Sequence, residues 1–396
     1  MKWIGKICVW MELVAMAFSS AALAQQAQRL DEGLHASAIV LSSPQDYQVF
    51  QRSSRLSGKI LIRGKASIPA DSVEVRLTGN SLRGPLSGKW KRVRLSRTSG
   101  DFHVAFAIAA GGFYRMQVRL LQRTKTVAET DVAHVGMGEV FIVAGQSNST
   151  NYGETLQKTQ SGMVSAWSPN GWQIADDPQP GVQDHSKKGS FVPPFGDALY
   201  GRIHVPVGIA SVGHGSTSIR QWLPAGDRVE AMPTMTKFIV KDDSGALVSD
   251  GTLFNGMMQC MQQFGEHGFR ALLWHQGESD ANQPPEHQIS AATYRKMVMR
   301  VIRASRKRAG WNFPWFVAEA TYHSPSDTST PAFEQAQQSL WASGIAFAGP
   351  NTDVLGAPYR QNNGKGVHMN DAGLKAHGAM WASILEQYIE STLVSK

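Results

Sequence analysis

The stretch "VFIVAGQSNS" (140–149) joins five apolar residues to a glycine and four polar residues. A short, nearly continuous apolar run of this kind is typical of a strand buried on both faces of a parallel sheet. Gly145 permits a sharp turn where the strand ends, so the hydroxyl of Ser147 would lie at the edge of the sheet. Open α/β sheets bind their ligands at that edge. The stretch therefore indicates an α/β fold and makes Ser147 a candidate nucleophile.

Further apolar runs follow along the chain, and segments of helical periodicity separate them. This alternation predicts an α/β domain over residues 138–396, in which helices cover both faces of a parallel sheet. The runs are "VPVGIA" (205–210), "ALLW" (271–274), "PWFVA" (314–318) and "IAFAG" (345–349).

Polar side chains follow the ends of several of these runs. The segments 214–216 and 275–278 each come shortly after one of them. Because ligands bind beyond the carboxyl ends of such strands, these groups are expected near the candidate nucleophile. His214, His275 and His323 each follow a run and are candidates for contact with a substrate.

Residues 36–135 have a different pattern. At least five short runs, among them "GKILIRG" (58–64) and "SVEVRLTG" (72–79), often alternate apolar and polar side chains between turn-forming residues. This pattern predicts a small β-sandwich. No cluster of His, Asp or Cys in it suggests chemistry.

Residues 1–24 have the layout of a cleaved secretory signal. Lys2 and Lys6 precede an apolar segment (7–18), and "SSAALA" ends at Ala24. This predicts cleavage after Ala24 and a mature protein in the periplasm or the medium, without stable membrane insertion. A retained anchor is the alternative, although the apolar segment is too short to span a bilayer.

The two cysteines and the charge narrow the class of protein. Cys8 would leave with the signal, so the mature chain could form no internal disulfide. Cys260 recurs at helical spacing with Phe254 and Met257, which predicts a core residue. The formal net charge of +8 would suit nucleic acid, but export argues against that partner. A solvated basic surface is expected instead, with attraction to an acidic polysaccharide as the alternative.

A base for the candidate nucleophile is expected among the histidines near the same sheet edge. "GKGVHMNDAGLKAHGAMW" (364–381) places His368 just before Asn370 or Asp371, either of which could cap a helix. A histidine just outside a capped helix is fixed in position and still accessible. His377 falls inside that helix and is expected to be structural.

Four blocks of the sequence resemble the successive motifs of the SGNH/GDSL hydrolases. The resemblance is to the branch of sialate O-acetylesterase-like and acetylxylan-esterase-like carbohydrate esterases, and it covers residues 138–390. It implies a three-layer α/β/α domain, preceded in some members by a β-sandwich, that removes acetyl groups from sugars without a metal or other cofactor. The blocks are "GQSN" (145–148), "GSTSIRQWLP" (215–224), "WHQGESD" (274–280) and "VHMNDAG" (367–373).

The resemblance also implies roles for individual residues. Ser147 matches the nucleophile and His368 matches the base. The N–H groups of Ser147 and Gly215 would form the oxyanion hole, where loss of one donor typically costs about a hundred- to a thousandfold in rate. Gln276 or Asn148 would add a side-chain donor, because the usual Gly-x-Asn block is absent.

Two positions depart from the family's pattern. Ser216 stands where a second glycine is common. Many members have an aspartate three residues before the base, but this chain has Lys365, whose side chain can donate a hydrogen bond and cannot accept one. In the branch with "HQGE" the glutamate takes over, which implies that Glu278 is the acid. Asp280 and Asp353 are the alternatives as the acid, and a structural role for Glu278, bonded to the backbone of its loop, is the alternative to a catalytic one.

Tryptophans are expected at the substrate, since aromatic faces suit the apolar faces of sugar rings. Trp222 is the first candidate, with a role as a core anchor as its alternative. Trp167 and Trp172 lie in a long, irregular segment (154–194) and are expected at the mouth of the crevice.

Together these features predict an exported serine esterase that removes O-acetyl groups from an acetylated glycan through an acyl-enzyme. A non-catalytic carbohydrate-binding protein and a transferase that passes the acetyl group to another sugar are the alternatives. Xylan, sialic acid, peptidoglycan and an exopolysaccharide are all open as the glycan, and so is the oligomeric state. No cofactor is expected, and the sequence has no metal-ligand spacing such as His-Glu-x-x-His.

Overall fold

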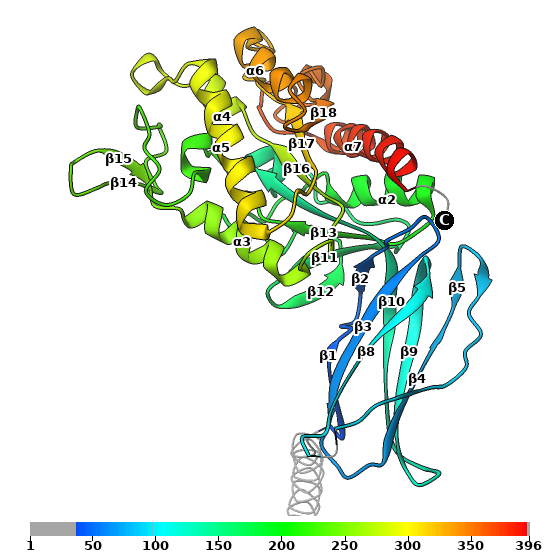
Figure 1. Cartoon of the computed structure of the whole chain (residues 1–396). Coiled ribbons are helices and arrows are strands. Elements are labelled where there is room, and N and C mark those ends of the chain that lie inside the picture. Colours follow the sequence, from blue (N-terminus) through cyan, green and yellow to red (C-terminus); the bar gives the residue numbers. More distant parts are fainter. Residues whose placement is uncertain (1–36, 97, 394–396) are drawn as a thin grey trace, which may run out of the picture.

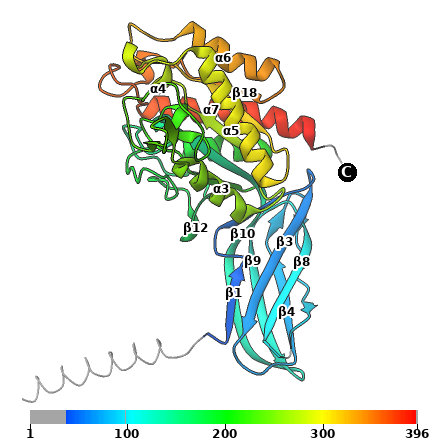
Figure 2. The ribbon, with the colours of Figure 1, turned by 60° about the vertical axis from the view of Figure 1, so that its left-hand side comes forward.

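The structure is a computed structural model that describes residues 37–96 and 98–393, in which a β-rich arm meets an α/β domain (Figures 1 and 2). The predicted signal over residues 1–24 lies outside the described residues. Within the described residues, no helix combines the length and the apolar character needed to cross a bilayer.

The β-rich arm is a sandwich of two antiparallel sheets, as predicted. One sheet consists of β1 (Ile39–Ser43), β3 (Ser57–Ala66) and β8 (Asp101–Ala109). In β3, Ile60 and Ile62 are buried while Lys59 is exposed, which is the period of two expected for a strand with one face in the core. The facing sheet contains β4 (Ser72–Thr78), β5 (Asn80–Ser81), β6 (Gly84–Pro85), β7 (Lys91–Val93), β9 (Gly111–Gln122) and the first half of β10 (Lys125–Gly145).

The second half of β10 is a central strand of the α/β sheet. The strand order is β12-β11-β13-β10-β16-β17-β18, and all neighbours are parallel except the antiparallel edge strand β12. The four apolar runs predicted as strands correspond to β13 (Val207–Ser211), β16 (Ala271–His275), β17 (Trp315–Glu319) and β18 (Phe347–Asn351). The segment predicted to be irregular instead contributes β11 (Val164–Ser168) and β12 (Gly171–Ile174).

Helices cover both faces of this sheet and complete three layers, which confirms the predicted fold class. Alternate residues of β10 face opposite cores: Phe141 and Val143 pack under one layer of helices, Ile142 and Ala144 under the other. The first layer is α2 (Val192–Ile203) and α7 (Asp371–Thr392), and the second is α3 (Thr252–Phe264), α5 (Ala291–Ala309) and α6 (Pro331–Ala342). Cys260 is buried in the second core, as predicted.

The remaining elements are short. They are β2 (Gln48–Gln51), the hairpin of β14 (Ile239–Lys241) and β15 (Leu247–Ser249), the helix α4 (Glu278–Ala281) and four 3₁₀ turns, η1 (Ser147–Ser149), η2 (Ile219–Trp222), η3 (Pro285–His287) and η4 (Ala357–Tyr359).

The arm and the α/β domain share β10. The boundary predicted between residues 135 and 138 falls inside this strand, where β2 pairs with it over residues 135–138. From Glu139 onward the partners of β10 are β13 and β16. One continuous backbone ladder therefore passes from the arm into the central sheet, with no linker between them.

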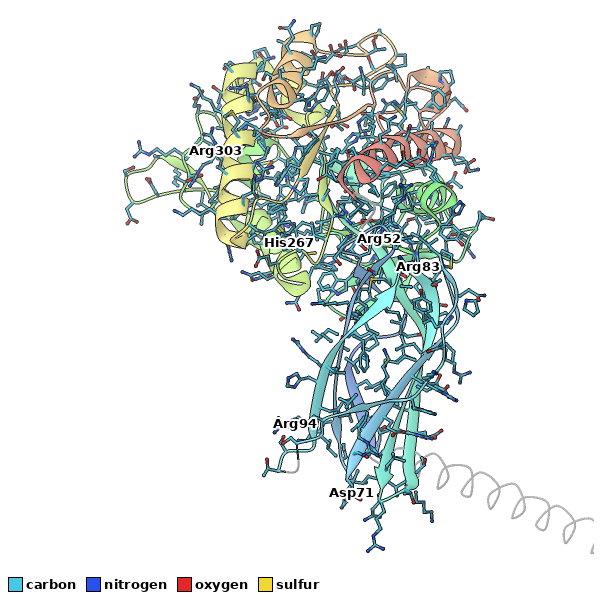
Figure 3. The ribbon with its side chains drawn as sticks, turned by 45° about the vertical axis from the view of Figure 1, so that its right-hand side comes forward. Arg52, Asp71, Arg83, Arg94, His267 and Arg303 are labelled. Carbon is cyan, nitrogen blue, oxygen red and sulfur yellow. The ribbon has the colours of Figure 1, made fainter. Side chains whose placement is uncertain are left out.

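A buried ion cluster holds this junction together. The Glu139 carboxylate is fully buried and accepts hydrogen bonds from Arg52 Nε at 2.6 Å, from Arg270 Nε at 2.7 Å and from Gln51 Nε2 at 2.9 Å. Burial alone would raise the pKa of Glu139, but the guanidinium groups of Arg270 and Arg52 lower it. Arg52 comes from the arm, and Figure 3 shows it where the arm meets the α/β domain. Arg270 comes from the segment before β16, so the cluster ties the two parts together.

Candidate active site

A cleft of about 290 Å³ opens beyond the carboxyl ends of β10 and β16. Segments far apart in the sequence form its walls, and they bring Ser147, Glu278 and His368 to one site. Ser216, Tyr322 and His323 also line it. Of the three histidines considered for substrate contact, His323 is therefore the one at the cleft.

Ser147 is the first residue of the 3₁₀ turn η1, which follows β10 directly. Gly145 has a φ of +130°, and a Cβ atom there would meet the carbonyl oxygen of His275 at 2.0 Å, so only glycine fits. The Ser149 hydroxyl donates to the Gln146 carbonyl at 2.6 Å and braces the turn. The Ser147 side chain is nearly buried but reaches the cleft, and its hydroxyl has no hydrogen-bond partner among the described residues.

His368 lies just before α7, where Asn370 caps the helix by accepting a hydrogen bond from the Gly373 N–H at 2.9 Å, as predicted. Its Nδ1 atom lies 2.9 Å from the side-chain amide nitrogen of Gln361. Burial lowers the pKa of His368 to about 4, although the negative charge of Glu278 acts in the opposite direction. The imidazole is therefore neutral at neutral pH and able to accept a proton.

Glu278 is held by two donors and has one oxygen to spare. Its Oε1 atom accepts from Asn148 Nδ2 at 2.9 Å and lies 3.0 Å from His275 Nε2. Its Oε2 atom is buried and has no hydrogen-bond partner among the described residues. Burial would raise the pKa of Glu278, but the charge and hydrogen bond of His275 outweigh burial and lower it to about 2. The carboxylate thus acts on His368 through its charge, while Gln361 makes the contact with Nδ1.

The two alternative acids have structural positions. Asp280 accepts from the Ser218 hydroxyl at 2.5 Å and from the Ile219 N–H at 2.7 Å. Asp353 accepts from the backbone and the hydroxyl of Thr321. Neither aspartate lines the cleft. Glu278 is therefore the carboxylate that shares the cleft with His368.

Three of the four predicted oxyanion donors, Gly215, Gln276 and Asn148, already have hydrogen-bond partners. The Gly215 N–H donates to Asp184 Oδ2 at 2.6 Å, so it is already paired. Gln276 is fully buried, and its amide donates to Asp280 Oδ2 at 2.6 Å. The Asn148 amide lines the cleft but donates to Glu278 and to the Val367 carbonyl. These groups are engaged in holding the walls of the cleft.

Two backbone N–H groups at the cleft do remain available. Neither the Ser147 N–H nor the Ser216 N–H has a hydrogen-bond partner among the described residues. Ser216 has a φ of +60°, a left-handed conformation that favours glycine. This explains in physical terms why a second glycine suits the position at which the chain has a serine.

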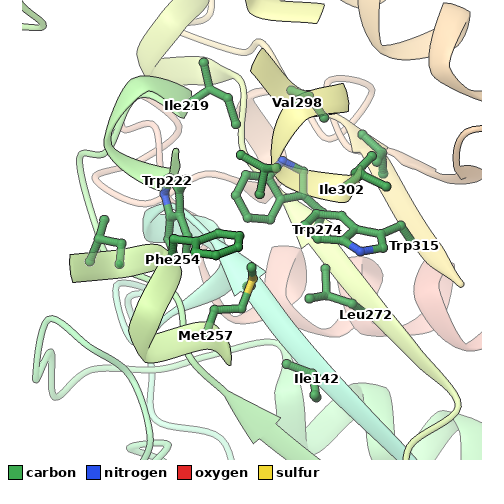
Figure 4. Packing of buried hydrophobic residues seen from close by; sticks show 14 of the residues in the cluster. Ile142, Ile219, Trp222, Phe254, Met257, Leu272, Trp274, Val298, Ile302 and Trp315 are labelled. Atoms are coloured by element: carbon green, nitrogen blue, oxygen red, sulfur yellow. The ribbon is translucent and has the colours of Figure 1, made fainter. Parts of the chain in front are cut away.

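Apart from His323, the side chains predicted to contact the substrate lie away from the cleft. Trp222 is fully buried against Trp274, with ring centroids 5.1 Å apart, and its indole N–H donates to the Thr217 hydroxyl at 3.0 Å (Figure 4). It is the core anchor of the alternative interpretation. His275 is buried between Glu278 and His377, so it cannot reach a substrate.

The other predicted contacts are not at the cleft either. His214 does not line it, and its Nδ1 atom lies 2.9 Å from the Gly215 carbonyl. Trp167 and Trp172 are cross-strand partners on β11 and β12, away from the cleft. Sequence reasoning missed Gln361, which precedes His368 by seven residues and gave no signal of its own.

Comparisons with known proteins identify the family and the fold. Residues 137–387 match a family model described as carbohydrate esterase, sialic acid-specific acetylesterase. A carbohydrate acetylesterase from Xanthomonas citri is similar in structure, with a TM-score of 0.54 and 19% identity, over 90% of this chain and 76% of that chain. This similarity shows the fold.

A protein from Arabidopsis thaliana has a TM-score of 0.43 and 17% identity over 65% of this chain and 99% of that chain. A family two carbohydrate esterase from Clostridium thermocellum, solved with cellohexaose, has a TM-score of 0.35 and 9% identity over 86% of this chain and 94% of that chain. A comparison with the sequences of curated proteins finds no significant match.

Proposed function

The chain belongs to the sialic acid-specific acetylesterase family of carbohydrate esterases, as its four sequence blocks predicted, and we propose that it removes O-acetyl groups from a glycan by serine catalysis. The observation that carries this mechanism is the cleft itself, which is lined by a serine whose hydroxyl has no hydrogen-bond partner among the described residues, a neutral histidine and a buried carboxylate. A nucleophile, a base and an acid that stabilises the charged base are the groups that ester hydrolysis requires.

In the proposed reaction the Ser147 oxygen attacks the acetyl carbonyl carbon while His368 takes the hydroxyl proton. The N–H groups of Ser147 and Ser216 are suited to stabilise the resulting oxyanion. The bond from the carbonyl carbon to the sugar oxygen then breaks, and His368 returns the proton to that oxygen. Water then attacks the acetyl-Ser147 ester while His368 takes its proton. The bond from the carbonyl carbon to the serine oxygen breaks, His368 returns the proton to that oxygen, and acetate is released.

Glu278 stabilises the imidazolium that forms in each step. Its carboxylate is ionised in the folded protein, and its charge raises the pKa of His368 relative to burial alone. Gln361 orients the ring. For Nε2 to accept the serine proton, Nδ1 must carry a hydrogen, so the side-chain oxygen of Gln361 would face it in the active form.

A covalent serine probe tests the nucleophile. A fluorophosphonate is expected to label the wild-type protein and to leave the Ser147→Ala variant unlabelled. Ser279→Ala is a matched control, because Ser279 lines the same cleft and its hydroxyl has no hydrogen-bond partner in the described part of the chain. Labelling of Ser147→Ala at the wild-type rate would refute the mechanism. A second measurement, the release of free acetate from acetylated xylan, separates hydrolysis from acetyl transfer, because transfer to another sugar releases none.

We further propose that the enzyme acts outside the cytoplasm after cleavage behind Ala24. The charged, apolar and small-residue segments at the start of the chain support this. Sequencing the amino terminus of the protein recovered from a cell that exports it is the test, and a mature protein that begins at Gln25 is the expected result.

A further inference from the structure

A second cleft, larger than the one at Ser147, lies where the arm meets the α/β domain. Its volume is about 480 Å³, within the range of ligand sites in proteins. Its walls come from β1, β2 and β3 of the arm and, on the other side, from β11, β12 and the end of α3. We call it the junction cleft.

The junction cleft lies toward the opposite end of the strands from Ser147. Val49 and Gln51, two of its lining residues, pair with β10 at Gly136 and Gly138, where β10 enters the α/β sheet. Ser147 follows the other end of that strand. The two clefts are therefore separate sites, and none of the residues that line one lines the other.

Two tryptophans form one wall. Trp167 and Trp172 are direct cross-strand partners, and both are half-buried. Phe264 meets both rings edge-on, with centroid distances of 5.3 and 5.9 Å, and so fixes their orientation. Rigid, partly exposed indole rings bind the apolar faces of sugar rings, and their N–H groups can bind hydroxyls.

Both sides of the cleft also supply side-chain hydrogen-bond donors that have no partner among the described residues. Lys59 and Arg63 lie two positions on either side of Leu61 on β3, are exposed, and form no ion pair among the described residues. Within residues 37–96 and 98–393, the Gln263 amide likewise forms no hydrogen bond. Among the lining residues, Glu266 carries the one carboxylate, and it lies 3.5 Å from His267.

The site is also preformed. Gln51 in its floor donates to the buried Glu139 carboxylate, which Arg52 and Arg270 clamp from the two sides of the junction. A cleft whose walls are fixed before binding loses little conformational freedom when a ligand enters.

We propose that the junction cleft binds a segment of a glycan chain that carries carboxylate groups, as in a polysaccharide of uronic acids. The tryptophan wall would stack on sugar rings, and Lys59 and Arg63 would pair with the carboxylates. The inference uses the proposed function for one point, that the substrate is a glycan. It gives the enzyme a site that holds the polymer apart from the site that cleaves the ester.

Binding is measured on the Ser147→Ala variant, so that catalysis does not change the probe. Alginate, polygalacturonate and hyaluronan are the acidic probes and amylose the neutral one, in affinity electrophoresis. Retardation by at least one acidic polymer and none by amylose is expected. Lys59→Glu is expected to weaken that binding about tenfold, and Trp172→Ala to weaken it as well.

Lys65→Glu is the matched control, because Lys65 is exposed on the same strand, changes the net charge equally and does not line the cleft. The proposal fails if no acidic polymer retards the protein, if amylose does so equally, or if Lys59→Glu and Lys65→Glu act alike. Hydrolysis of 4-nitrophenyl acetate by Lys59→Glu with Ser147 intact is expected at the wild-type rate. If the wild-type protein itself does not hydrolyse 4-nitrophenyl acetate, the proposed function is refuted instead.

Discussion

The Nδ1 atom of His368 contacts the side-chain amide of Gln361 at 2.9 Å, whereas Glu278, the carboxylate in the same cleft, accepts a hydrogen bond from Asn148 and lies 3.0 Å from His275 Nε2. In the proposed mechanism, a neutral group would therefore orient the base and a charge would stabilise it. This division determines how activity depends on pH and on each of the two side chains.

The first prediction concerns the wild-type enzyme. A protonated His368 cannot accept the serine proton, and burial lowers the pKa of His368 to about 4. We therefore expect kcat/KM for 4-nitrophenyl acetate to be constant from neutral pH down to about pH 5. Below about pH 4 it should fall about tenfold per pH unit. A midpoint near 6.5, the ordinary value for histidine, would contradict the burial of the base.

The second prediction concerns Gln361→Glu. A carboxylate at Nδ1 favours the imidazolium, so the pKa of His368 rises and the acidic limb of the pH profile moves to higher pH. Gln361→Met, which removes the contact without adding charge, is the control and should leave that limb in place while lowering kcat. If both variants have the wild-type profile and kcat, Gln361 has no role in positioning the base.

The third prediction concerns Glu278→Gln. Loss of the charge removes the stabilisation of the imidazolium, so kcat is expected to fall about a hundred- to ten-thousandfold. The acidic limb should also move to lower pH, because the carboxylate raises the pKa of His368. Asp280→Asn and Asp353→Asn affect groups outside the cleft and should act mainly on stability, measured by urea unfolding. An active Glu278→Gln variant beside an inactive Asp353→Asn would reassign the acid.

The fourth prediction concerns the junction. Glu139→Gln leaves the guanidinium groups of Arg52 and Arg270 without their buried counter-charge, which typically costs about 3–5 kcal/mol of unfolding free energy. Glu390→Gln is the control, since Glu390 is exposed and lies 3.8 Å from an exposed Arg55. That change should cost less than about 1 kcal/mol. Equal effects in urea unfolding would mean that the cluster does not hold the junction.

Much of the α/β domain could be predicted because local hydrophobicity determines it. The runs at β10, β13, β16 and β17 are apolar throughout and lie under helices on both faces. The run at β11, "VSAWS", mixes apolar and hydroxyl side chains, so its pattern does not separate a strand from a loop. Its place in the sheet comes from pairing with β13, a tertiary contact that no local signal carries.

The candidate site, too, could be predicted from the sequence only in part. The positions of Ser147 at a strand end and of His368 beside a helix cap could be predicted, because both features are visible in the sequence. The role of Gly215 could not, since its N–H is taken by Asp184, 31 residues earlier in the chain. Trp222 could not be placed either, because an aromatic residue after a motif looks the same whether the fold buries it or exposes it.

The unbroken course of β10 has a consequence for the length of the glycan. From Gly138, beside the junction cleft, to Gly145 at the end of β10 the chain advances seven residues, about 23 Å at the rise of a β-strand, and Ser147 follows in the next turn. No hinge lies between these points, so the two clefts are held at a fixed separation. Under the two proposals above, an acetylated oligosaccharide shorter than this separation would occupy one cleft at a time. A longer polymer would bind in the junction cleft while it is deacetylated at Ser147. Turnover per acetyl group would then rise in a step, rather than gradually, once the glycan is long enough to reach both clefts.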